Sequence, residues 1–344
     1  MPIVAGSMKV LITGGAGFIG CNWAARLMRE GHDVTVYDNL SRKGTSANLD
    51  WLRSQGELNF VHGDIRDAVA LAEVAKGHHA IYHLAAQVAV TTSVANPRED
   101  FEINALGTFN VLEAARLSGM RPVVVYASTN KVYGGMEDVQ VAEDATRWRY
   151  ADLPLGMSES QPLDFHSPYG CSKGAGDQYV RDYARIYGLP TVAFRQSSVY
   201  GFRQFGVEDQ GWIAHLIIAT VKGHPINIYG DGKQVRDMLW VDDLLDAYAI
   251  ALKHPEKIAG KIYNVGGGPE YALSIWTEVQ PILESLAERK ISVTYGDWRP
   301  GDQKVYISDI RKAEAELGWK PKVSPQEGIK RLWEWVSANA ELFE

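Results

Sequence analysis

Two residues four positions apart, Tyr169 and Lys173 in the segment Ser-Pro-Tyr-Gly-Cys-Ser-Lys, could exchange a proton with a substrate. On a helix this spacing puts both side chains on one face, one turn apart. A nearby ammonium stabilises a phenolate, so we expect the phenol of Tyr169 to act as an acid and a base near neutral pH. The alternative is a surface pair on a helix, since the pattern alone is common by chance.

Hydroxyl and amide side chains follow another apolar run, in the segment Tyr-Ala-Ser-Thr-Asn-Lys-Val-Tyr-Gly that begins at Tyr126. A hydroxyl at Ser128 or Thr129 could bond the substrate oxygen that is being oxidised. The alternative is turn chemistry at the end of a strand, where such side chains satisfy local backbone groups. Because Tyr169 and Lys173 stand in the same chain, we favour the catalytic interpretation.

The segment KVLITGGAGFIG is the most specific local signal in the chain. Gly15, Gly17 and Gly20 fit the spacing G-x-G-x-x-G, and Gly14, Gly17 and Gly20 fit the wider G-x-x-G-x-x-G. Such glycines permit a tight turn, let backbone amides approach a pyrophosphate, and let the next helix pack on its strand. The partial positive charge at the start of that helix attracts phosphate. The alternative is an ordinary glycine turn between a strand and a helix.

An acidic residue stands where a dinucleotide site requires one. Asp38 ends the second apolar run, eighteen residues after Gly20, and can accept hydrogen bonds from an adenosine ribose. Its charge repels a 2′-phosphate, so the sequence predicts NAD rather than NADP, although Arg42 and Lys43 could weaken that preference. Asp64 suits the adenine, or else is simply a helix cap.

Short β-branched runs alternate with amphipathic stretches through the first half of the chain, which is typical of a parallel sheet with crossover helices. We expect strands at 8–13, 34–37, 58–61, 80–84, 123–127 and 190–194. We expect helices at 18–30, 67–76, 104–118 and 172–187. Such a sheet binds ligands beyond the carboxyl ends of its strands, where the motifs lie.

After about residue 201 the chain becomes richer in glycine, proline and tryptophan, with loops expected at 230–237, 297–303 and 319–325. The predicted fold is α/β: a Rossmann-type doubly wound parallel sheet with a smaller C-terminal α/β substrate-binding region. We expect the NAD-binding domain at 8–195, with 235–266 returning to it through a strand at 261–266. The substrate-binding region is expected at 196–234 and 267–344.

The composition excludes several classes of protein. At 344 residues, with 46% hydrophobic and 22% charged residues, the chain has the composition of a soluble globular protein. The formal charge of −7 argues against nucleic-acid binding. The sequence contains no run of eighteen apolar residues, so we expect no membrane span. The two cysteines, Cys21 and Cys171, fit a reducing cytoplasm. Residues 1–7 lack the pattern of a signal peptide, and Met8 could be the natural start.

Taken together, the motifs resemble the extended short-chain dehydrogenases/reductases over nearly the whole chain from Met8 onward. The likeness rests on the glycine turn, the Ser/Thr segment, Tyr169 with Lys173, and the run from Phe194-Arg195 to Val-Tyr-Gly at 199–201. Within that superfamily, the segments STNKVYG and LDFHSPYGCSKG resemble the CDP-paratose 2-epimerase (CDP-tyvelose epimerase) family. The segments RQF at 203–205, DQGW at 209–212 and GKQVRD at 232–237 add to the match.

This resemblance implies a role for each residue. Thr129 takes the catalytic Ser/Thr position, Tyr169 is the acid and base, and Lys173 is its partner. Arg236 and Arg299 fall where related enzymes bind the substrate diphosphate. A guanidinium suits this role because it bonds phosphate oxygens bidentately. The alternative for each arginine is a surface salt bridge.

Two sets of contacts are therefore expected. The substrate contacts are Ser128, Thr129, Asn130, Lys131, His166, Arg203, Gln204, Arg236, Arg299 and Asp302. The NAD contacts are Gly14, Gly17, Phe18, Ile19, Gly20, Asp38, Asn39, Asp64, Ile65, Leu84, Ala85, Ala86, Gln87, Asn104, Tyr169 and Lys173. Asp302 is expected to orient Arg299 or to bind the nucleoside ribose. No metal site is expected, because the histidines lack ligand spacing.

The implied reaction is a nucleotide-sugar 2-epimerisation without net redox change. Tyr169, as phenolate, removes the proton of the 2-hydroxyl while NAD accepts a hydride from carbon 2. The 2-keto sugar then turns and takes the hydride back on its other face, so NADH must stay bound. The substrate favoured by the resemblance is a CDP-hexose. Related enzymes commonly assemble as homodimers or homotetramers through helices of the nucleotide-binding domain. The apolar stripes on the expected helices at 104–118 and 172–187 fit such an interface, but they also fit burial against the sheet.

Three other functions stay open. A nucleotide-sugar 4-epimerase uses the same parts with carbon 4 presented instead. A 4,6-dehydratase of the related family carries Asp-Glu after the threonine, as acid and base for eliminating water, and this chain has Asn130 and Lys131 there. The third is a non-catalytic NAD-binding protein on the same fold. Such a protein needs no catalytic triad, so the presence of Thr129, Tyr169 and Lys173 argues against this function.

Overall fold

The computed structural model describes residues 6–299 and 302–343. These residues divide into two compact units, the first built from 6–129, 167–195 and 245–263, and the second from 130–166, 196–244 and 264–343. The boundaries differ from the expected ones, because 130–166 belongs to the second unit and the returning segment is 245–263. Parts of the expected segments 1–7, 297–303 and 267–344 lie outside the described residues, namely 1–5, 300, 301 and 344.

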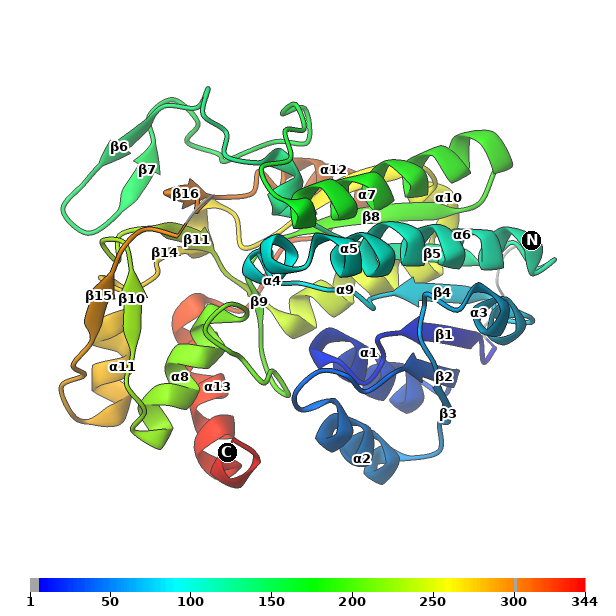
Figure 1. Cartoon of the computed structure of the whole chain (residues 1–344), viewed down its shortest axis with the longest axis horizontal. Coiled ribbons are helices and arrows are strands. Elements are labelled where there is room, and N and C mark those ends of the chain that lie inside the picture. Colours follow the sequence, from blue (N-terminus) through cyan, green and yellow to red (C-terminus); the bar gives the residue numbers. More distant parts are fainter. Residues whose placement is uncertain (1–5, 300–301, 344) are drawn as a thin grey trace. The chain divides into compact units, whose positions relative to one another are not determined.

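The first unit is built on a seven-stranded parallel sheet with the strand order β13-β8-β5-β4-β1-β2-β3 (Figure 1). The strands are β1 (Lys9–Thr13), β2 (Asp33–Asp38), β3 (Asn59–His62), β4 (Ala80–His83), β5 (Val123–Thr129), β8 (Thr191–Gln196) and β13 (Lys261–Val265). The order reverses between β1 and β4, which is the switch point where a doubly wound sheet binds ligands. The predicted Rossmann-type fold is therefore confirmed, with each expected strand within two residues of its expected ends.

Helices cover both faces of this sheet. They are α1 (Phe18–Arg29), α2 (Thr45–Gln55), α3 (Ala68–Ala75), α4 (Val90–Ala95), α5 (Pro97–Asp100), a π-helical turn η1 (Phe101–Leu106), α6 (Gly107–Leu117), α7 (Pro168–Tyr187), α9 (Val241–Lys253) and α10 (Pro255–Ile258). On one face, Leu11, Ile81 and Val124 share a buried cluster with side chains of α3, α6 and α7. On the other, the ring of Tyr82 lies 5.0 Å from that of Trp23 and 5.4 Å from that of Tyr248. Side chains that alternate along each strand thus build two separate cores.

Helix α7 begins four residues earlier than the expected start at 172. Ser167 is its N-cap, and the hydroxyl oxygen of Ser167 accepts a 3.0 Å hydrogen bond from the amide of Gly170. Pro168 follows at the first helical position, where proline is favoured because its missing N–H costs nothing there. The pair Ser-Pro was therefore the signal for the start of this helix.

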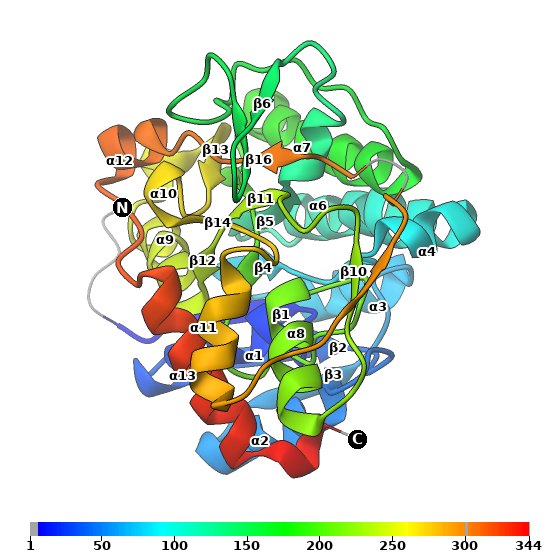
Figure 2. The same cartoon turned by 90° about the vertical axis from the view of Figure 1, so that its left-hand side faces the viewer.

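The second unit contains short strands and a group of helices. The strands are β6 (Val141–Glu143), β7 (Trp148–Tyr150), β9 (Val199–Tyr200), β10 (Asn227–Tyr229), β11 (Val235–Asp237), β12 (Leu239–Trp240), β14 (Ala272–Ser274), β15 (Thr294–Gly296) and β16 (Val305–Tyr306). The helices are η2 (Asn130–Tyr133), α8 (Trp212–Lys222), η3 (Pro269–Tyr271), α11 (Val279–Ala287), α12 (Arg311–Leu317), α13 (Pro325–Ala338) and η4 (Ala340–Leu342). Figure 2 shows α8, α11 and α13 side by side.

One expected loop of this unit is partly a strand. Residues 235–237, at the end of the expected loop 230–237, form β11, which pairs with β14 and β16 in a three-stranded sheet. The ring of Tyr306, on β16, stacks with that of Tyr133, and the ring centres are 6.2 Å apart. Across the described residues, every helix is too short or too polar to cross a lipid bilayer.

Candidate active site

The glycine turn after β1 forms a cradle that leaves no room for side chains. Gly14 has a φ of +70°, and a Cβ atom there would lie 2.6 Å from the backbone nitrogen of Ala85. A Cβ atom at Gly20 would overlap the carbonyl oxygen of Gly14. Gly17 is the N-cap of α1 and has no side chain to bond the first amides of the helix. Those amides, which include Phe18 and Ile19, are therefore suited to bind an anion.

Asp38 lies at the end of β2, beside this cradle. Its buried carboxylate accepts hydrogen bonds from the amides of Ala16, at 3.0 Å, and Leu40, at 2.8 Å. Burial raises the pKa of Asp38, and these two bonds oppose the shift. Each carboxylate oxygen keeps a further lone pair, so the residue fits the ribose hydroxyls of a dinucleotide.

Asp64, after β3, pairs with two neighbouring side chains. Arg66 donates to it at 2.7 Å and Asn39 at 2.9 Å, and the bond with Arg66 lowers the pKa of Asp64 to about 2. The alternative that Asp64 caps a helix is wrong, because the cap of α3 is Asp67. Ile65 packs into the core of the first unit. The structure thus brings Asp64 and Asn39 together, while the side chain of Ile65 is buried among apolar neighbours.

The segment after β4, residues 84–87, is held by Asn104 of the π-helical turn. The amide of Gln87 donates to Asn104 Oδ1 at 2.9 Å, and Asn104 Nδ2 donates to the Gln87 carbonyl at 2.9 Å. The amide of Leu84 bonds the Thr13 carbonyl at 3.0 Å, next to the glycine turn. Turns of π-helix are frequent at functional sites. The expected cofactor contacts at residues 84–87, at Asn104 and in the glycine turn therefore lie close together, although they come from separate parts of the chain.

Tyr169 and Lys173 both lie buried on α7, with Thr129 at the end of β5. The Tyr169 and Thr129 side chains share a hydrogen bond. Burial raises the pKa of Tyr169 to about 12, although the bond with Thr129 opposes the shift. Burial also lowers the pKa of Lys173 to about 7, opposed by the charge of Asp177. The structure thus brings together the three residues expected to perform catalysis.

The expectation that the Lys173 ammonium makes Tyr169 acidic does not hold in this structure. Lys173 Nζ donates to the Ala127 carbonyl at 2.6 Å and lies 4.2 Å from the ring centre of Tyr126. The largest influence on the phenol is its burial, which disfavours the phenolate. The pKa of Tyr169 is accordingly raised and not lowered.

Ser128 belongs to a buried polar network that sequence reasoning missed. Its hydroxyl donates to Asp177 at 2.7 Å, and Asp177 accepts two bonds from Arg195, at 3.0 and 2.8 Å. All three side chains are buried. Because successive strand residues point to opposite faces, Ser128 points away from Thr129. The hydroxyl of Ser128 is thus engaged in a structural bond.

In the second unit, the two arginines expected at the diphosphate each bind a carboxylate. Arg236 donates to Asp302 at 2.7 Å, and Arg299 pairs with Asp209 at 3.1 Å while lying 3.9 Å from the ring centre of Tyr229. Asp302 therefore orients Arg236, contrary to the expectation that it orients Arg299. Its own amide does bond the Arg299 carbonyl, at 3.1 Å.

Asn130 and Lys131 begin the second unit in η2. Asn130 Nδ2 donates to Gln303 Oε1 at 3.4 Å. Burial, together with the charge of Arg236, lowers the pKa of Lys131 to about 8, and Asp302 opposes the shift. The Lys131 ammonium thus belongs to the same group of charges as the pair formed by Arg236 and Asp302.

Three other expected substrate contacts bond to different parts of the second unit. His166 pairs with Asp164 at 2.9 Å. Arg203 lies over the ring of Trp335 at 5.6 Å. Gln204 is buried, and its Nε2 donates to the Val199 carbonyl at 3.3 Å.

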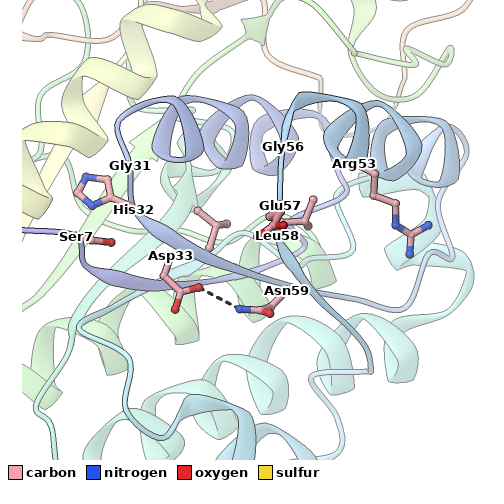
Figure 3. A pocket seen from close by; sticks show the side chains of 10 residues that line it. Ser7, Gly31, His32, Asp33, Arg53, Gly56, Glu57, Leu58 and Asn59 are labelled. Carbon is pink, nitrogen blue, oxygen red and sulfur yellow. Dashed lines mark hydrogen bonds between the residues drawn. The ribbon is translucent and has the colours of Figure 1, made fainter.

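A hollow lies at the opposite, amino ends of β2 and β3 (Figure 3). Its lining includes His32, Asp33 and Arg53, and Asn59 donates to Asp33 at 3.0 Å. None of the residues that line it is an expected site residue. Ligands of doubly wound sheets bind at the other edge, so this hollow is not the candidate active site. In the part of the chain that the structure describes, no three His, Cys, Asp or Glu side chains gather as a metal site would require.

The chain is similar to known proteins over nearly its whole length. Residues 11–332 match the family described as GDP-mannose 4,6 dehydratase. CDP-paratose 2-epimerase of Salmonella typhi is 46% identical over 338 residues, which cover 96% of this chain and 100% of that protein.

Two solved structures are similar along their whole length. The UDP-glucose 4-epimerase of Thermotoga maritima, solved with UDP-glucose, has a TM-score of 0.84 and 30% identity, covering 97% of this chain and 100% of that one. A dTDP-glucose 4,6-dehydratase of Streptomyces venezuelae, solved with NAD bound, has a TM-score of 0.83 and 34% identity, covering 98% and 99%.

Proposed function

Because the chain belongs to the GDP-mannose 4,6-dehydratase family of extended short-chain dehydrogenases/reductases, we propose that it is an NAD-dependent nucleotide-sugar epimerase that inverts carbon 2 of a CDP-hexose. The observation that carries this proposal is the 46% identity with CDP-paratose 2-epimerase over the whole of that relative. Thr129, Tyr169 and Lys173 are the catalytic residues.

The residues of the first unit fit NAD. The glycine cradle admits a pyrophosphate, the first amides of α1 supply partial positive charge, and Asp38 suits the ribose. When bound, NAD supplies the acceptor that takes a hydride from the sugar and later returns it. The dehydratase with a TM-score of 0.83 contains NAD, which supports this choice of cofactor.

Tyr169 moves the proton. In the resting protein its phenol is protonated, because burial raises its pKa to about 12. Positive charge next to the phenol lowers that pKa, and the bond from Thr129 acts in the same direction. Tyr169 then removes the proton of the 2-hydroxyl and returns it after the sugar has turned, while Thr129 holds the reacting oxygen. Because the side chain is buried, bulk water has little access to this proton.

Asn130 and Lys131 argue against a dehydratase. Eliminating water from a sugar needs an acid and a base, which the related dehydratases carry at these two positions. A neutral amide such as Asn130 is a poor proton donor, and the Lys131 amine cannot replace a carboxylate base while it is charged. With a pKa of about 8, Lys131 is mostly charged at neutral pH.

The second candidate is a nucleotide-sugar 4-epimerase. It is favoured by the TM-score of 0.84 with the UDP-glucose 4-epimerase structure. Both reactions use Thr129, Tyr169 and Lys173 in the same way, and they differ in which carbon of the sugar the pocket presents. The lower identity of that protein, 30% against 46%, makes it the weaker candidate.

The diphosphate of the substrate is bound by cations of the second unit. Arg236 and Arg299 each have a partly exposed ion pair, which a phosphate can replace with a charge-assisted bidentate bond. Lys131 adds a third positive charge beside Arg236. We infer a cytidine nucleotide because the relative with the highest identity named above is an epimerase of a CDP-sugar.

The protein assembles as a homodimer or homotetramer in this proposal. Exposed apolar side chains gather on the outer faces of α6 and α7, among them Phe109, Leu117, Tyr179, Ile186 and Tyr187. The rings of Phe109 and Tyr179 are in edge contact at 6.0 Å, so the two helices share one apolar surface. Such a surface on a monomer marks a protein interface. In the part of the chain that the structure describes, neither Cys21 nor Cys171 belongs to a disulfide bond, which fits a cytoplasmic location.

A panel of CDP-, UDP- and GDP-hexoses tests the function. We expect CDP-paratose labelled with deuterium at carbon 2 to be converted into its 2-epimer with the label retained, since the hydride returns to the same carbon. A product inverted at carbon 4, or one that has lost water, would replace the proposal with the corresponding alternative. The variant Tyr169→Phe is the control for activity from contaminating enzymes.

A further inference from the structure

Asp100, the last residue of α5, is a buried acid that no sequence motif marks. Asp100 is only 1% exposed to solvent. Three side chains donate to its carboxylate: Ser172 Oγ at 2.6 Å, Gln87 Nε2 at 2.9 Å and Asn104 Nδ2 at 3.0 Å. Asp100 thus joins the segment after β4, the π-helical turn and α7, which carry expected cofactor and catalytic residues.

Ser172 connects Asp100 to the catalytic pair. It stands between Tyr169 and Lys173 on α7, and its hydroxyl also lies 3.2 Å from the Tyr169 carbonyl oxygen. The same hydroxyl lies 3.3 Å from Asn104 Nδ2. A displacement of the Asp100 carboxylate would therefore reach the first turn of α7 through a single side chain.

The charge of Asp100 is balanced differently from that of Asp177, the other buried acid bonded to this region. Asp177 forms two bonds with the guanidinium of Arg195, so its charge is paired in place. The three donors to Asp100 carry no charge. A buried carboxylate is costly unless it is hydrogen-bonded and a cation is near, and Lys173 is the cation whose charge acts on it.

We propose that Asp100 is a positioning residue of the active site, which holds the first turn of α7 in place through Ser172 and supplies a buried negative charge that balances Lys173. This inference rests on the proposed function, because it takes Tyr169 and Lys173 as the proton-handling pair. Asp100 itself touches neither substrate nor cofactor in this role.

The groups around Tyr169 agree with this assignment. The charge of Asp100 raises the pKa of the phenol beyond the increase that burial causes. The bond from Thr129 and the charge of Arg42 oppose this increase. Asp100 is the only acid among these influences, so removing its charge is expected to let the phenolate form at lower pH.

The groups around Lys173 likewise indicate that removing the charge of Asp100 lowers the pKa of its neighbour. Burial lowers the pKa of the ammonium, and the charges of Asp177 and Asp100 raise it. Two neighbours carry no charge at neutral pH: the ring of Tyr126, and His83, because burial lowers the pKa of His83 to about 3. Removing the charge of Asp100 is therefore expected to lower the pKa of Lys173 further.

The test is Asp100→Asn, which keeps the shape of the side chain and removes its charge. In protein labelled with carbon-13 at lysine Cε, the resonance that disappears in Lys173→Met identifies Lys173. We expect the titration midpoint of that resonance to fall by about one pH unit in Asp100→Asn. The acid limb of the pH profile of kcat/KM with CDP-paratose should move to lower pH by a similar amount. Asp100→Ser, a smaller neutral variant, replaces Asp100→Asn if the latter does not fold.

Two controls separate charge from structure. Ser172→Ala removes the connecting bond but keeps the charge, so both midpoints should stay at the wild-type pH while kcat falls. Glu102→Gln removes an equal charge from the neighbouring turn and should change neither midpoint. The inference would be overturned if Asp100→Asn kept the wild-type midpoints of the Lys173 titration and of the kcat/KM profile. It would also be overturned if Ser172→Ala shifted these midpoints as much as Asp100→Asn does. The lysine titration needs no substrate, so its outcome is independent of whether CDP-paratose is turned over.

Discussion

The ammonium of Lys173 donates a 2.6 Å hydrogen bond to the backbone carbonyl of Ala127, two residues before Thr129 on β5. This bond joins α7 to the end of β5, the strand on which Thr129 meets the phenol of Tyr169. The three groups are thus held by buried bonds of the protein itself. A site whose geometry is set in advance loses little freedom when the substrate binds.

Removal of the phenol oxygen is the most direct test of this arrangement. We expect Tyr169→Phe to lower kcat for epimerisation by about 10³-fold, because it removes the group that transfers the proton. The rate is measured from the appearance of the 2-epimer. The control is Tyr295→Phe, which changes an exposed tyrosine of the second unit and should keep the wild-type rate. Full turnover by Tyr169→Phe would contradict the assigned role.

The neighbouring hydroxyls of Ser128 and Thr129 are expected to behave differently. Ser128→Ala removes a 2.7 Å bond to the buried Asp177 and should lower the free energy of unfolding by about 2 kcal/mol. Thr129→Val should lower kcat by about 10²-fold with a much smaller effect on stability. Urea unfolding and steady-state rates measure the two effects. The reverse pattern would exchange the two roles.

Much of the fold was predictable because local patterns determine it. The strands β1 to β5 and β8 are short apolar runs bounded by glycine, acidic or turn residues, and their ends followed from that contrast. The strand β11 was missed because it directly follows a glycine-rich turn at Gly230 and Gly232, which resembles a loop. Its strand character comes from pairing with β14 and β16, which lie far along the chain.

The electrostatics of the site were not predictable from spacing. The interval between Tyr169 and Lys173 predicts a common helix face but contains no information on burial, which controls both pKa values. Asp100 was missed for a related reason. Its donors Gln87 and Ser172 stand 13 and 72 residues away along the chain, so only the folded structure reveals that this acid is bonded.

The ion pair between Asp209 and Arg299 should compete with the substrate. Both side chains are partly exposed, so the pair contributes about 0.2–1 kcal/mol. We expect Asp209→Asn to tighten binding of CDP by about two- to fivefold, because Arg299 no longer has to leave a carboxylate. Isothermal titration with CDP measures the change. Glu208→Gln removes an equal charge 4.0 Å from the same nitrogen and should have a smaller effect. If both variants tightened CDP binding equally, the loss of any negative charge near Arg299 would explain the effect, and the ion pair with Asp209 would not.

His83 should make the first unit sensitive to acid. Burial lowers its pKa from 6.5 to about 3, and its ring nitrogens bond the hydroxyls of Thr13, at 2.8 Å, and Thr108, at 3.0 Å. Between these pH values the unfolded chain binds a proton that the folded protein does not, so stability is lost as the pH falls below 6.5. The loss attributable to His83 is about 2 kcal/mol between pH 6.5 and pH 5.

This loss is measured as the free energy of unfolding in urea at the two pH values. His83→Gln should lose about 2 kcal/mol less than the wild type over this interval. His254→Gln, which changes a partly exposed histidine, should behave as the wild type. An identical pH dependence in His83→Gln and the wild type would show that the ring is not held neutral.

The apolar surface on α6 and α7 should be needed for assembly. Ile186, on the last turn of α7, is 67% exposed, and we expect Ile186→Asp to shift the protein to a smaller species in sedimentation velocity. Val69 on α3 is 78% exposed and lies outside this surface, so Val69→Asp is the matched control. A wild-type sedimentation coefficient for Ile186→Asp would exclude this face as the interface.

The strand order of the large sheet has a consequence for synthesis on the ribosome. β13 pairs with β8 at one end of the sheet, yet its residues follow β8 only after a long stretch that belongs to the second unit. While that stretch is being translated, the nascent chain carries β8 as an open edge. Open edges template aggregation, so the growing polypeptide is expected to depend on chaperones during this interval. A premature stop codon before Lys261 would make that exposure permanent.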